Sequence, residues 1–491
     1  MMSFSQLMVL APAIIVAIAL IAAMLCISVK RSHLTTAVIT VIGLNAALAY
    51  TLYQAAGFIF QMQNGAGAGL SIGITDLFIV DGMALFAMIL ILISALAVTL
   101  LCYYYIKTFN ENKEELYLLL MLSTIGALLL VCSSHMTSFF VSLELLSVPL
   151  YGMIAYTHER SKSLEASLKY LVLSATASAA ILMGLAFIYG FSGTMSFSGL
   201  AAMILTAPNN TFLVLGGILF LFGVAFKLSL VPFHAWTPDV YQGSPMPVTA
   251  FLATVSKVAV LVVVLRFFQS SSLWLSSGFI AVLTVLAVAS VLVGNLLALK
   301  QSNLKRLMGY SSIAHFGYAL IAIVTLGPSA TSTVNLYLAF YVLTSIGAFG
   351  VLTLMSVPYR QDLDASNMSE YRGLFWRRPV LAAVLTVMML SFAGIPMTLG
   401  FIGKFYIVLA SVLAMNFLLA AVVVIGSGIG LYYYLRVMVV LYMTPPEKPN
   451  FDAQVGWEYQ LGGLMVLATA LLVLIFGVYP APIMALAGIL V

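Results

Sequence analysis

Four ionisable residues lie inside stretches that are otherwise apolar enough to span a membrane: Glu144, Lys227, Lys257 and Lys404. The chain of 491 residues is 63% hydrophobic and only 7% charged, and almost every other charge lies in a loop or at a helix end. An ionisable side chain near the bilayer centre costs about 2.5–3.5 kcal/mol on insertion scales. Four such groups in one chain are therefore the first candidates for function.

These residue types suit proton transfer. Burial of a lone ionisable group favours its neutral form, whereas an opposite charge nearby favours its charged form. Lys227 is the expected partner of Glu144, so a change in their separation would change the protonation of both. Lys257 and Lys404 are expected to pass or receive protons, because lysine, unlike arginine, can release its proton when buried. Structural ion pairs between helices are the alternative, but one glutamate leaves two of the three lysines unmatched.

Two histidines extend this set of candidates. His234 follows Lys227 by seven residues, which places both on one face of a helix with Pro232 between them. His315 lies in a polar stripe and is expected to link Lys257 with Lys404; a hydrogen-bonded packing histidine is the other interpretation. The sequence contains no metal-ligand set, no haem pair and no cofactor motif, so we expect no cofactor or metal in this chain.

The elements that must position these residues are membrane helices. Runs of 18 or more nearly uncharged residues predict transmembrane helices, and the chain has about fourteen. We therefore expect an all-α polytopic membrane protein without a soluble domain. The expected spans are 5–29, 35–56, 78–106, 114–133, 135–157, 165–191, 211–240, 245–268, 275–299, 304–326, 333–357, 378–407, 410–442 and 461–486.

Charge placement predicts the orientation. Most of the 20 lysines and arginines, Lys305 among them, fall in the loops after odd-numbered helices. Cytoplasmic loops carry such an excess, so both termini are expected on the non-cytoplasmic side of a bacterial inner (plasma) membrane. The basic residues do not cluster on a soluble domain, so nucleic acid is not an expected partner.

Two of the expected helices are interrupted, 211–240 at Pro232 and 378–407 at Pro396. Proline removes an amide donor and displaces the carbonyl four residues back, here those of Leu228 and Phe392. The breaks are five helices apart, which predicts two inverted five-helix repeats, helices 4–8 and 9–13, around an ion pathway. The alternative is that proline and glycine are simply commoner in membrane helices. The expected division of the one membrane domain is 1–110, 111–268, 275–442 and 461–491.

Four segments carry a family resemblance: KLSLVPFHAWTPDVYQG at 227–243, TVSK at 254–257, KRLMGYSSIAH at 305–315 and GIPMTLGFIGKF at 394–405. They resemble the antiporter-like membrane subunits of respiratory complex I. The fourteen-helix length and YRGLFW at 371–376 are most similar to the N-type branch of that family. The resemblance implies that Glu144, Lys227, Lys257 and Lys404 are its relay positions. It also places His234 and His315 on its central polar axis.

The resemblance implies a proton-translocating subunit of NADH:quinone oxidoreductase. Its expected partners are the other membrane subunits, the lipid bilayer, protons and the quinone that the assembly uses. Flavin and iron–sulfur clusters are expected in partner subunits, since this chain has no motif for them. Two alternatives remain open: a subunit of a multisubunit sodium/proton antiporter, and a structural or assembly subunit without its own channel.

Overall fold

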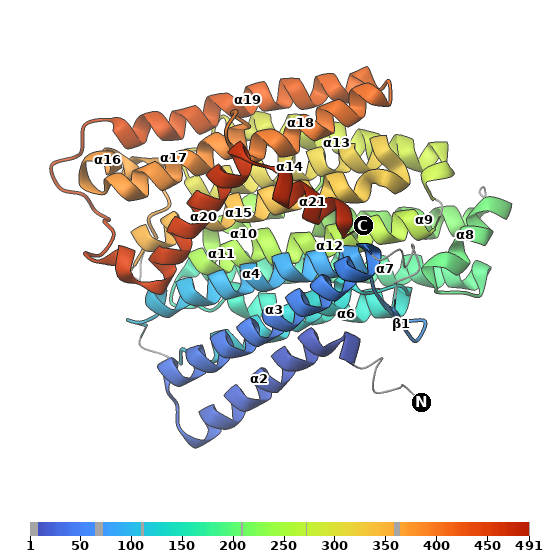
Figure 1. Ribbon diagram of the computed structural model, residues 1–491, viewed down its shortest axis with the longest axis horizontal. Coiled ribbons are helices and arrows are strands. Elements are labelled where there is room, and N and C mark those ends of the chain that lie inside the picture. Colours follow the sequence, from blue (N-terminus) through green and yellow to red (C-terminus); the bar gives the residue numbers. More distant parts are fainter. Residues whose placement is uncertain are drawn as a thin grey trace.

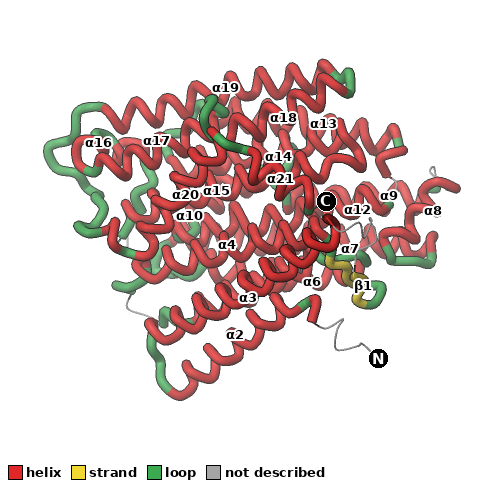
Figure 2. Tube along the Cα trace, viewed as in Figure 1, coloured by secondary structure: helices red, strands yellow, loops and turns green. Residues whose placement is uncertain are grey.

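The computed structural model describes residues 8–63, 72–109, 112–207, 210–271, 273–357 and 364–490. Most of these residues are helical, and the long helices run side by side along the long axis of the molecule (Figures 1 and 2). Within the described residues, ten helical stretches are long and apolar enough to cross a membrane. One of them, Leu304–Met355, contains two successive helices. The expected all-α polytopic membrane fold is confirmed.

The uninterrupted spans agree with the expected ones to within several residues at most ends. They are α2 (Ala11–Val29), α3 (His33–Gln63), α4 (Gly82–Tyr105), α5 (Glu115–Val131), α6 (Met136–Ile154), α7 (Ser161–Ser192), α13 (Ser277–Ala298), α14 (Leu304–Leu326), α15 (Thr331–Met355), α19 (Phe417–Tyr442) and α20 (Leu461–Val478). α3 continues beyond its expected end at 56. After it, a short hairpin pairs β1 (Ile72–Ile74) with β2 (Phe78–Val80) in antiparallel register.

The two interrupted helices break where the prolines predict. The first consists of α9 (Thr211–Lys227) and α10 (Trp236–Gly243), and the second of α17 (Pro379–Ala393) and α18 (Leu399–Leu413). The latter continues past the expected end at 407. A third interruption was not predicted: α11 (Met246–Phe251) and α12 (Lys257–Ser270) are joined by a π-helical turn at Leu252–Ser256. Such turns carry no proline or glycine signal, and they are frequent at functional sites.

Several short elements were also not predicted from the sequence, because they contain too few residues for a periodic pattern. They are α8 (Phe197–Thr206), α16 (Leu374–Arg377) and 3-10 turns at Leu273–Leu275, Gly327–Ala330, Met368–Tyr371 and Trp457–Tyr459. The expected span 461–486 is wrong in its last part: α20 ends at Val478, and a separate helix α21 (Ala481–Ile489) begins after Pro480, which cannot continue α20.

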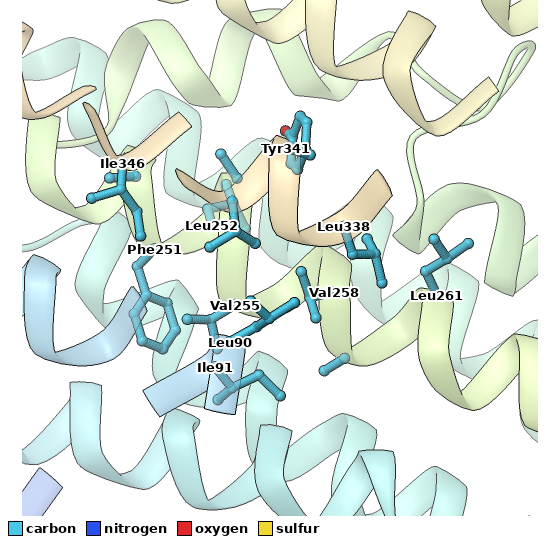
Figure 3. Close-up of a cluster of buried hydrophobic side chains, with 14 of the residues drawn as sticks. Leu90, Ile91, Phe251, Leu252, Val255, Val258, Leu261, Leu338, Tyr341 and Ile346 are labelled. Atoms are coloured by element: carbon cyan, nitrogen blue, oxygen red, sulfur yellow. The ribbon is translucent and has the colours of Figure 1, made fainter. Parts of the chain in front are cut away.

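The core of the bundle is formed by α4, α11, α12, α14 and α15. Figure 3 shows one buried cluster in which Leu90 and Ile91 of α4 and Leu338 of α15 pack around Val255 and Val258. In contrast, fewer than half of the residues of α2, α7, α13 and α20 are buried. Their outer faces carry apolar residues such as Ile21, Leu168 and Leu471. An outer surface of this kind belongs in lipid or against other membrane subunits.

The arrangement places the ends of the chain on one side. In Figure 1, α2 starts and α21 ends toward the right of the bundle, whereas α16 and its neighbouring loops lie at the left. Arg377 and Arg378 belong to that left end. The sidedness of the membrane remains a prediction.

Candidate functional site

Lys227 is the last residue of α9 and is buried between α6 and α7. Its Nζ atom donates to the Oγ atoms of Ser147 and Ser174, each at 2.8 Å. The hydroxyl of Tyr151 also donates to Ser174, at 2.9 Å. The ammonium group of Lys227 is therefore held by neutral oxygens rather than by a carboxylate.

Glu144 lies on α6 and is half-buried. Its Oε1 atom accepts a hydrogen bond from the Oγ atom of Ser178 at 2.6 Å. Ser174 and Ser178 are four residues apart, one above the other on α7, so Lys227 and Glu144 bind adjacent hydroxyls of one helix. The two charges form no direct ion pair in the structure; serine hydroxyls lie between them.

The break after Lys227 is satisfied by protein groups. The carbonyl of Phe226 accepts from the indole Nε1 of Trp236 at 3.1 Å, and the amide of Val231 donates to the Ser290 hydroxyl at 3.0 Å. His234 lies in the turn that precedes α10 and is half-buried. α9 ends at Lys227 and residues 228–235 are not helical, so the prediction that Lys227 and His234 share one helix face is wrong. No hydrogen bond of the described residues joins the His234 ring to Lys227.

Lys257 opens α12 directly after the π-helical turn and is only 1% exposed. Its Nζ atom donates to the Ser312 hydroxyl on α14 at 2.8 Å, and Ser312 in turn shares a hydrogen bond of 2.7 Å with the hydroxyl of Tyr341 on α15. The ring centroids of Phe316 and Tyr241 lie 5.1 and 5.7 Å from Nζ, within the range of cation–π attraction. No ion pair involves Lys257 within the described chain.

Lys404 lies on α18 and reaches back across the second break. Its Nζ atom donates to the carbonyl of Phe392 at 2.7 Å and to that of Ala393 at 3.1 Å. Phe392 carries the carbonyl that the sequence predicts to be displaced by Pro396. Gly394 ends α17 with φ = 84°, and a Cβ atom there would lie 2.9 Å from the Cδ atom of Lys404. Glycine is therefore required where the lysine stem crosses the chain.

His315 is buried on α14, the helix whose Ser312 binds Lys257, and its ring lies near Phe392, whose carbonyl binds Lys404. Its Nδ1 atom lies 2.7 Å from the Tyr337 hydroxyl, and its Nε2 atom lies 3.2 Å from the Tyr434 hydroxyl. The hydroxyl of Tyr434 also shares a hydrogen bond of 2.5 Å with Ser311. The ring of Phe392, whose carbonyl binds Lys404, has its centroid 5.2 Å from that of His315.

The site therefore has two parts. Glu144 and Lys227 form one part with the serines of α6 and α7, whereas Lys257, His315 and Lys404 belong to a second part lined by tyrosines. Serine and tyrosine hydroxyls can both donate and accept hydrogen bonds, so they can conduct a proton. A lysine bound only to neutral oxygens can lose its proton without leaving a carboxylate unpaired. Within the described residues, no group of three or more His, Cys, Asp or Glu side chains is placed to hold a metal ion.

The structure also reveals two buried ion-pair groups that were not singled out in the sequence. The first joins Asp364 to Arg160 at 3.0 Å and to Lys305 at 3.3 Å, with the Tyr105 hydroxyl donating to Asp364 at 2.7 Å. Lys305 was expected to be a loop charge, but it is 1% exposed. Burial alone would raise the pKa of Asp364, but the charges of Lys305 and Arg160 hold that pKa below its usual range.

The second group joins Arg266 at the far end of α12 to Asp81, which caps α4, through two hydrogen bonds of 2.6 and 2.8 Å. Arg266 also donates to the carbonyl of Val131 at 3.2 Å. The partners in both groups come from segments far apart in the chain, so no local sequence signal indicates the pairing.

Fold and site together define a polytopic membrane protein with buried lysines beside two broken helices. The family model "NADH:quinone oxidoreductase/Mrp antiporter, TM" matches residues 133–430, which cover both breaks and all six candidate residues. The chain belongs to this family of membrane subunits.

Two curated relatives resemble the chain over nearly its whole length. "NADH-quinone oxidoreductase subunit N" of Acinetobacter baumannii (strain AB0057) is 53% identical over 485 residues, covering 99% of this chain and 96% of the relative. The subunit of the same name from Psychrobacter arcticus (strain DSM 17307 / VKM B-2377 / 273-4) is 50% identical over 470 residues, covering 96% and 94%. These relatives agree with the N-type resemblance that the sequence motifs indicate.

Solved structures share the fold. A chain of respiratory complex I from Thermus thermophilus superposes with a TM-score of 0.80 at 31% identity, covering 96% of this chain and 98% of the other. A chain of the Mrp complex from Dietzia sp. DQ12-45-1b gives a TM-score of 0.84 at 20% identity, covering 98% and 96%. At that lower identity the second likeness concerns the fold alone.

Proposed function

We propose that this chain is a proton-translocating membrane subunit of an NADH:quinone oxidoreductase, and that Glu144, Lys227, Lys257, His315 and Lys404 form its relay. The observation that carries the relay is the common environment of the three lysines. Each is buried, and each ammonium group is bound by hydroxyl or carbonyl oxygens of another helix or helix half. The relatives named as subunit N support the assignment to that assembly.

In the first part of the relay, a proton moves between Lys227 and Glu144 through the hydroxyls of Ser174 and Ser178. Glu144 accepts from Ser178 while Lys227 donates to Ser174, so both ends of this short route are occupied by ionisable side chains. A movement of α7 would change both contacts at once. The protonation of Lys227 and that of Glu144 would then change together.

In the second part, protons move between Lys257 and Lys404 past His315. The groups along the way are Ser312 and Tyr341 beside Lys257, then Ser311, Tyr434 and Tyr337 around the imidazole. Lys404, held by the Phe392 carbonyl, ends this part. Water is required wherever successive groups do not touch. His234 lies apart from these contacts, and its assignment to the axis rests on the family resemblance alone.

The energy for translocation has to come from outside the chain. Moving one charge against the membrane potential requires about 2.3 kcal/mol per 100 mV, and the sequence has no nucleotide-binding or redox motif. We therefore place the flavin, the iron–sulfur clusters and the quinone reaction in partner subunits. Other membrane subunits would deliver the energy through the apolar outer faces of the bundle.

The paired breaks also support the inverted-repeat organisation, helices 4–8 and 9–13, although their lysines are used differently. Lys227 ends the half-helix before its break and points to serines of other helices, whereas Lys404 follows its break and binds the carbonyls freed by it. Residues 111–268 and 275–442 then form the two repeats. The expected location is the bacterial inner membrane, with both termini on the non-cytoplasmic side.

Alanine substitution tests the relay. In the assembled complex, Lys227→Ala and Lys404→Ala should each reduce NADH-driven proton uptake into inverted membrane vesicles by about tenfold or more, because each removes a proton-carrying group. Lys448→Ala, at an exposed loop position, is the control and should pump normally. Subunit content is measured in the same vesicles. Full pumping by assembled Lys227→Ala or Lys404→Ala complexes would exclude the relay.

The same vesicles separate the alternatives. A subunit of a sodium/proton antiporter would exchange sodium for protons without NADH oxidation. This possibility is favoured by the family model, whose description includes the Mrp antiporter, and by the shared fold of the Mrp chain. A purely structural subunit would lower the amount of the complex in both alanine variants without lowering pumping per complex.

A further inference from the structure

Lys305 is buried as deeply as the proposed relay lysine Lys257; each is 1% exposed. It is the second residue of α14, the helix that also carries Ser312 and His315. Its Nζ atom donates to the carbonyl of Ser244 at 2.5 Å and to Asp364 at 3.3 Å. A buried ammonium at the start of this helix is not needed by the relay described above.

The surroundings of Lys305 place it where several segments meet. Asp364 follows α15, Arg160 precedes α7, Tyr105 ends α4 and Ser244 lies between α10 and α11. These are helix ends on the side to which most loop lysines and arginines belong. Of the two cations bound to Asp364, only lysine can release a proton, because a guanidinium stays charged.

A line of polar atoms leads from Lys305 toward Lys257. The hydroxyl of Ser244, whose carbonyl binds Lys305, shares a hydrogen bond of 2.7 Å with that of Thr249, which also donates to the carbonyl of Tyr241 at 3.3 Å. The ring of Tyr241 lies 5.7 Å from the Nζ atom of Lys257. Polar groups therefore line the turn between the two lysines. Because backbone carbonyls only accept hydrogen bonds, water has to carry the proton between the hydroxyls of Ser244, Thr249 and Tyr241.

The helix itself provides a second connection. Lys305 and Ser312 are seven residues apart, which places them on one face of α14 and about 10 Å apart along its axis. Ser312 is the hydroxyl that binds Lys257. The buried hydroxyl of Tyr241 meets no partner at hydrogen-bonding geometry, although the hydroxyls of Ser312 and Tyr341 lie near it. The Tyr241 hydroxyl therefore lies beside Ser312, the hydroxyl that binds Lys257, at the end of this line of polar groups.

We propose that Lys305 is a further proton-carrying residue, which supplies Lys257 from the cytoplasmic end of α14 along Ser244, Thr249 and Tyr241, with Asp364 as its counter-ion. This inference rests on the proposed function. The ammonium of Lys305 gives one proton to the first water or hydroxyl of the line, and the last member gives one proton to the neutral amine of Lys257. Lys305 then regains a proton from the aqueous side, so only N–H and O–H bonds break and form.

The competing explanation is a static ion pair that clamps the ends of α7 and α14 together. Lys305→Arg separates the two, because arginine keeps the positive charge and the donors but cannot pass on a proton. We expect Lys305→Arg complexes to assemble and to pump about tenfold or more slowly. Lys169→Arg, at a surface lysine paired with Glu165 and Asp239, is the matched control and should pump normally. Pumping per assembled complex at the wild-type rate in Lys305→Arg would overturn the proposal.

Arginine is larger than lysine, so the Lys305→Arg complex could fail to assemble, and its pumping could then not be measured. Tyr241→Phe is therefore the second variant. The change removes one hydroxyl and leaves the ring beside Lys257 and the ion pair of Lys305 with Asp364 in place, so a clamp formed by Lys305 should not be affected. We expect normal assembly and pumping reduced severalfold. Unchanged pumping in Tyr241→Phe argues against the route even if Lys305→Arg fails to assemble. If Lys227→Ala loses pumping while Lys305→Arg and Tyr241→Phe both pump normally, the role of Lys305 is excluded and the proposed function is not affected.

Discussion

At the scale of single residues, the lysines differ in what they touch, and these contacts decide how each can act. Lys227 and Lys257 bind hydroxyls, which can take over a proton themselves, whereas Lys404 binds two backbone carbonyls, which can only accept a hydrogen bond. A proton that leaves Lys404 must therefore go to another group or to water. Lys404 is best suited to the end of the route, as the family resemblance implies.

The close contact between Gly394 and Lys404 leads to a prediction. Gly394→Ala places a side chain at φ = 84° and within 2.9 Å of the lysine stem, so it should destabilise the subunit by at least about 1–2 kcal/mol and reduce pumping. Thermal unfolding of the purified complex and proton uptake measure the two effects. Gly428→Ala is the control, because a Cβ atom there meets nothing within 4 Å. Equal stability of the two variants would contradict the prediction.

The sequence was sufficient to find the ionisable residues that the structure places inside the helix bundle, because a charge is conspicuous in an apolar helix. It was insufficient for their contacts. Ser174 and Ser178 resemble ordinary small residues of a membrane helix, yet they separate Lys227 from Glu144. Lys305 looked like a loop charge because it lies at a helix end, and its carboxylate partner follows 59 residues later.

At the scale of elements, length and hydropathy predicted the long helices because a bilayer imposes both requirements on every span. The two breaks were predictable because proline has no backbone N–H and cannot complete the helical hydrogen bonds. The π-helical turn at Leu252–Ser256 was not. It arises where α11 and α12 are packed on all sides in the core, and packing of this kind leaves no signal in a single sequence.

The link between Asp364 and the starts of α7 and α14 predicts a dependence on pH. The pKa of Asp364 is lower in the folded chain than in the unfolded one, so its ionised form contributes stability above the unfolded value of about 4. That contribution is lost as the pH falls through the folded pKa. Asp364→Asn should therefore cost about 3–5 kcal/mol at neutral pH, because it leaves two buried cations without their carboxylate.

Thermal unfolding at several pH values checks this prediction. The difference in stability between the wild type and Asp364→Asn should be largest at neutral pH and should shrink as the solution is acidified below about 4. Asp76→Asn serves as the control because Asp76 is exposed. A difference that stays constant over the whole pH range would show that Asp364 does not stabilise the fold as an ion.

At the scale of the whole molecule, a core of buried helices is surrounded by helices with apolar outer faces (Figure 1). The proposed relay groups lie on α6, α7, α9, α12, α14 and α18, so they pass from the side of the bundle through its core. A subunit built in this way can receive movement at its surface and transmit it to groups shielded from lipid. It thus suits a member of an assembly better than an isolated transporter.

The predicted orientation can be tested with single cysteines in a chain whose three native cysteines have been replaced. Lys448→Cys lies in the loop after α19, and Met415→Cys lies in the turn between α18 and α19, so the two are at opposite ends of α19; both positions are exposed. If the excess of positive charge marks the cytoplasm, a membrane-impermeant maleimide should label Lys448→Cys in inverted vesicles and Met415→Cys in spheroplasts. The reverse pattern would invert the topology.

The contact between Lys404 and the carbonyls of Phe392 and Ala393 has a consequence for the mechanics of the subunit. The end of α17 carries the negative pole of that helix, and the ammonium of Lys404 neutralises it. The protonation of Lys404 and the position of α17 are therefore thermodynamically linked, and such linkage is reciprocal. Protonation of Lys404 strengthens its attraction to the carbonyl end of α17. In turn, a partner subunit that displaces α17 changes the proton affinity of Lys404.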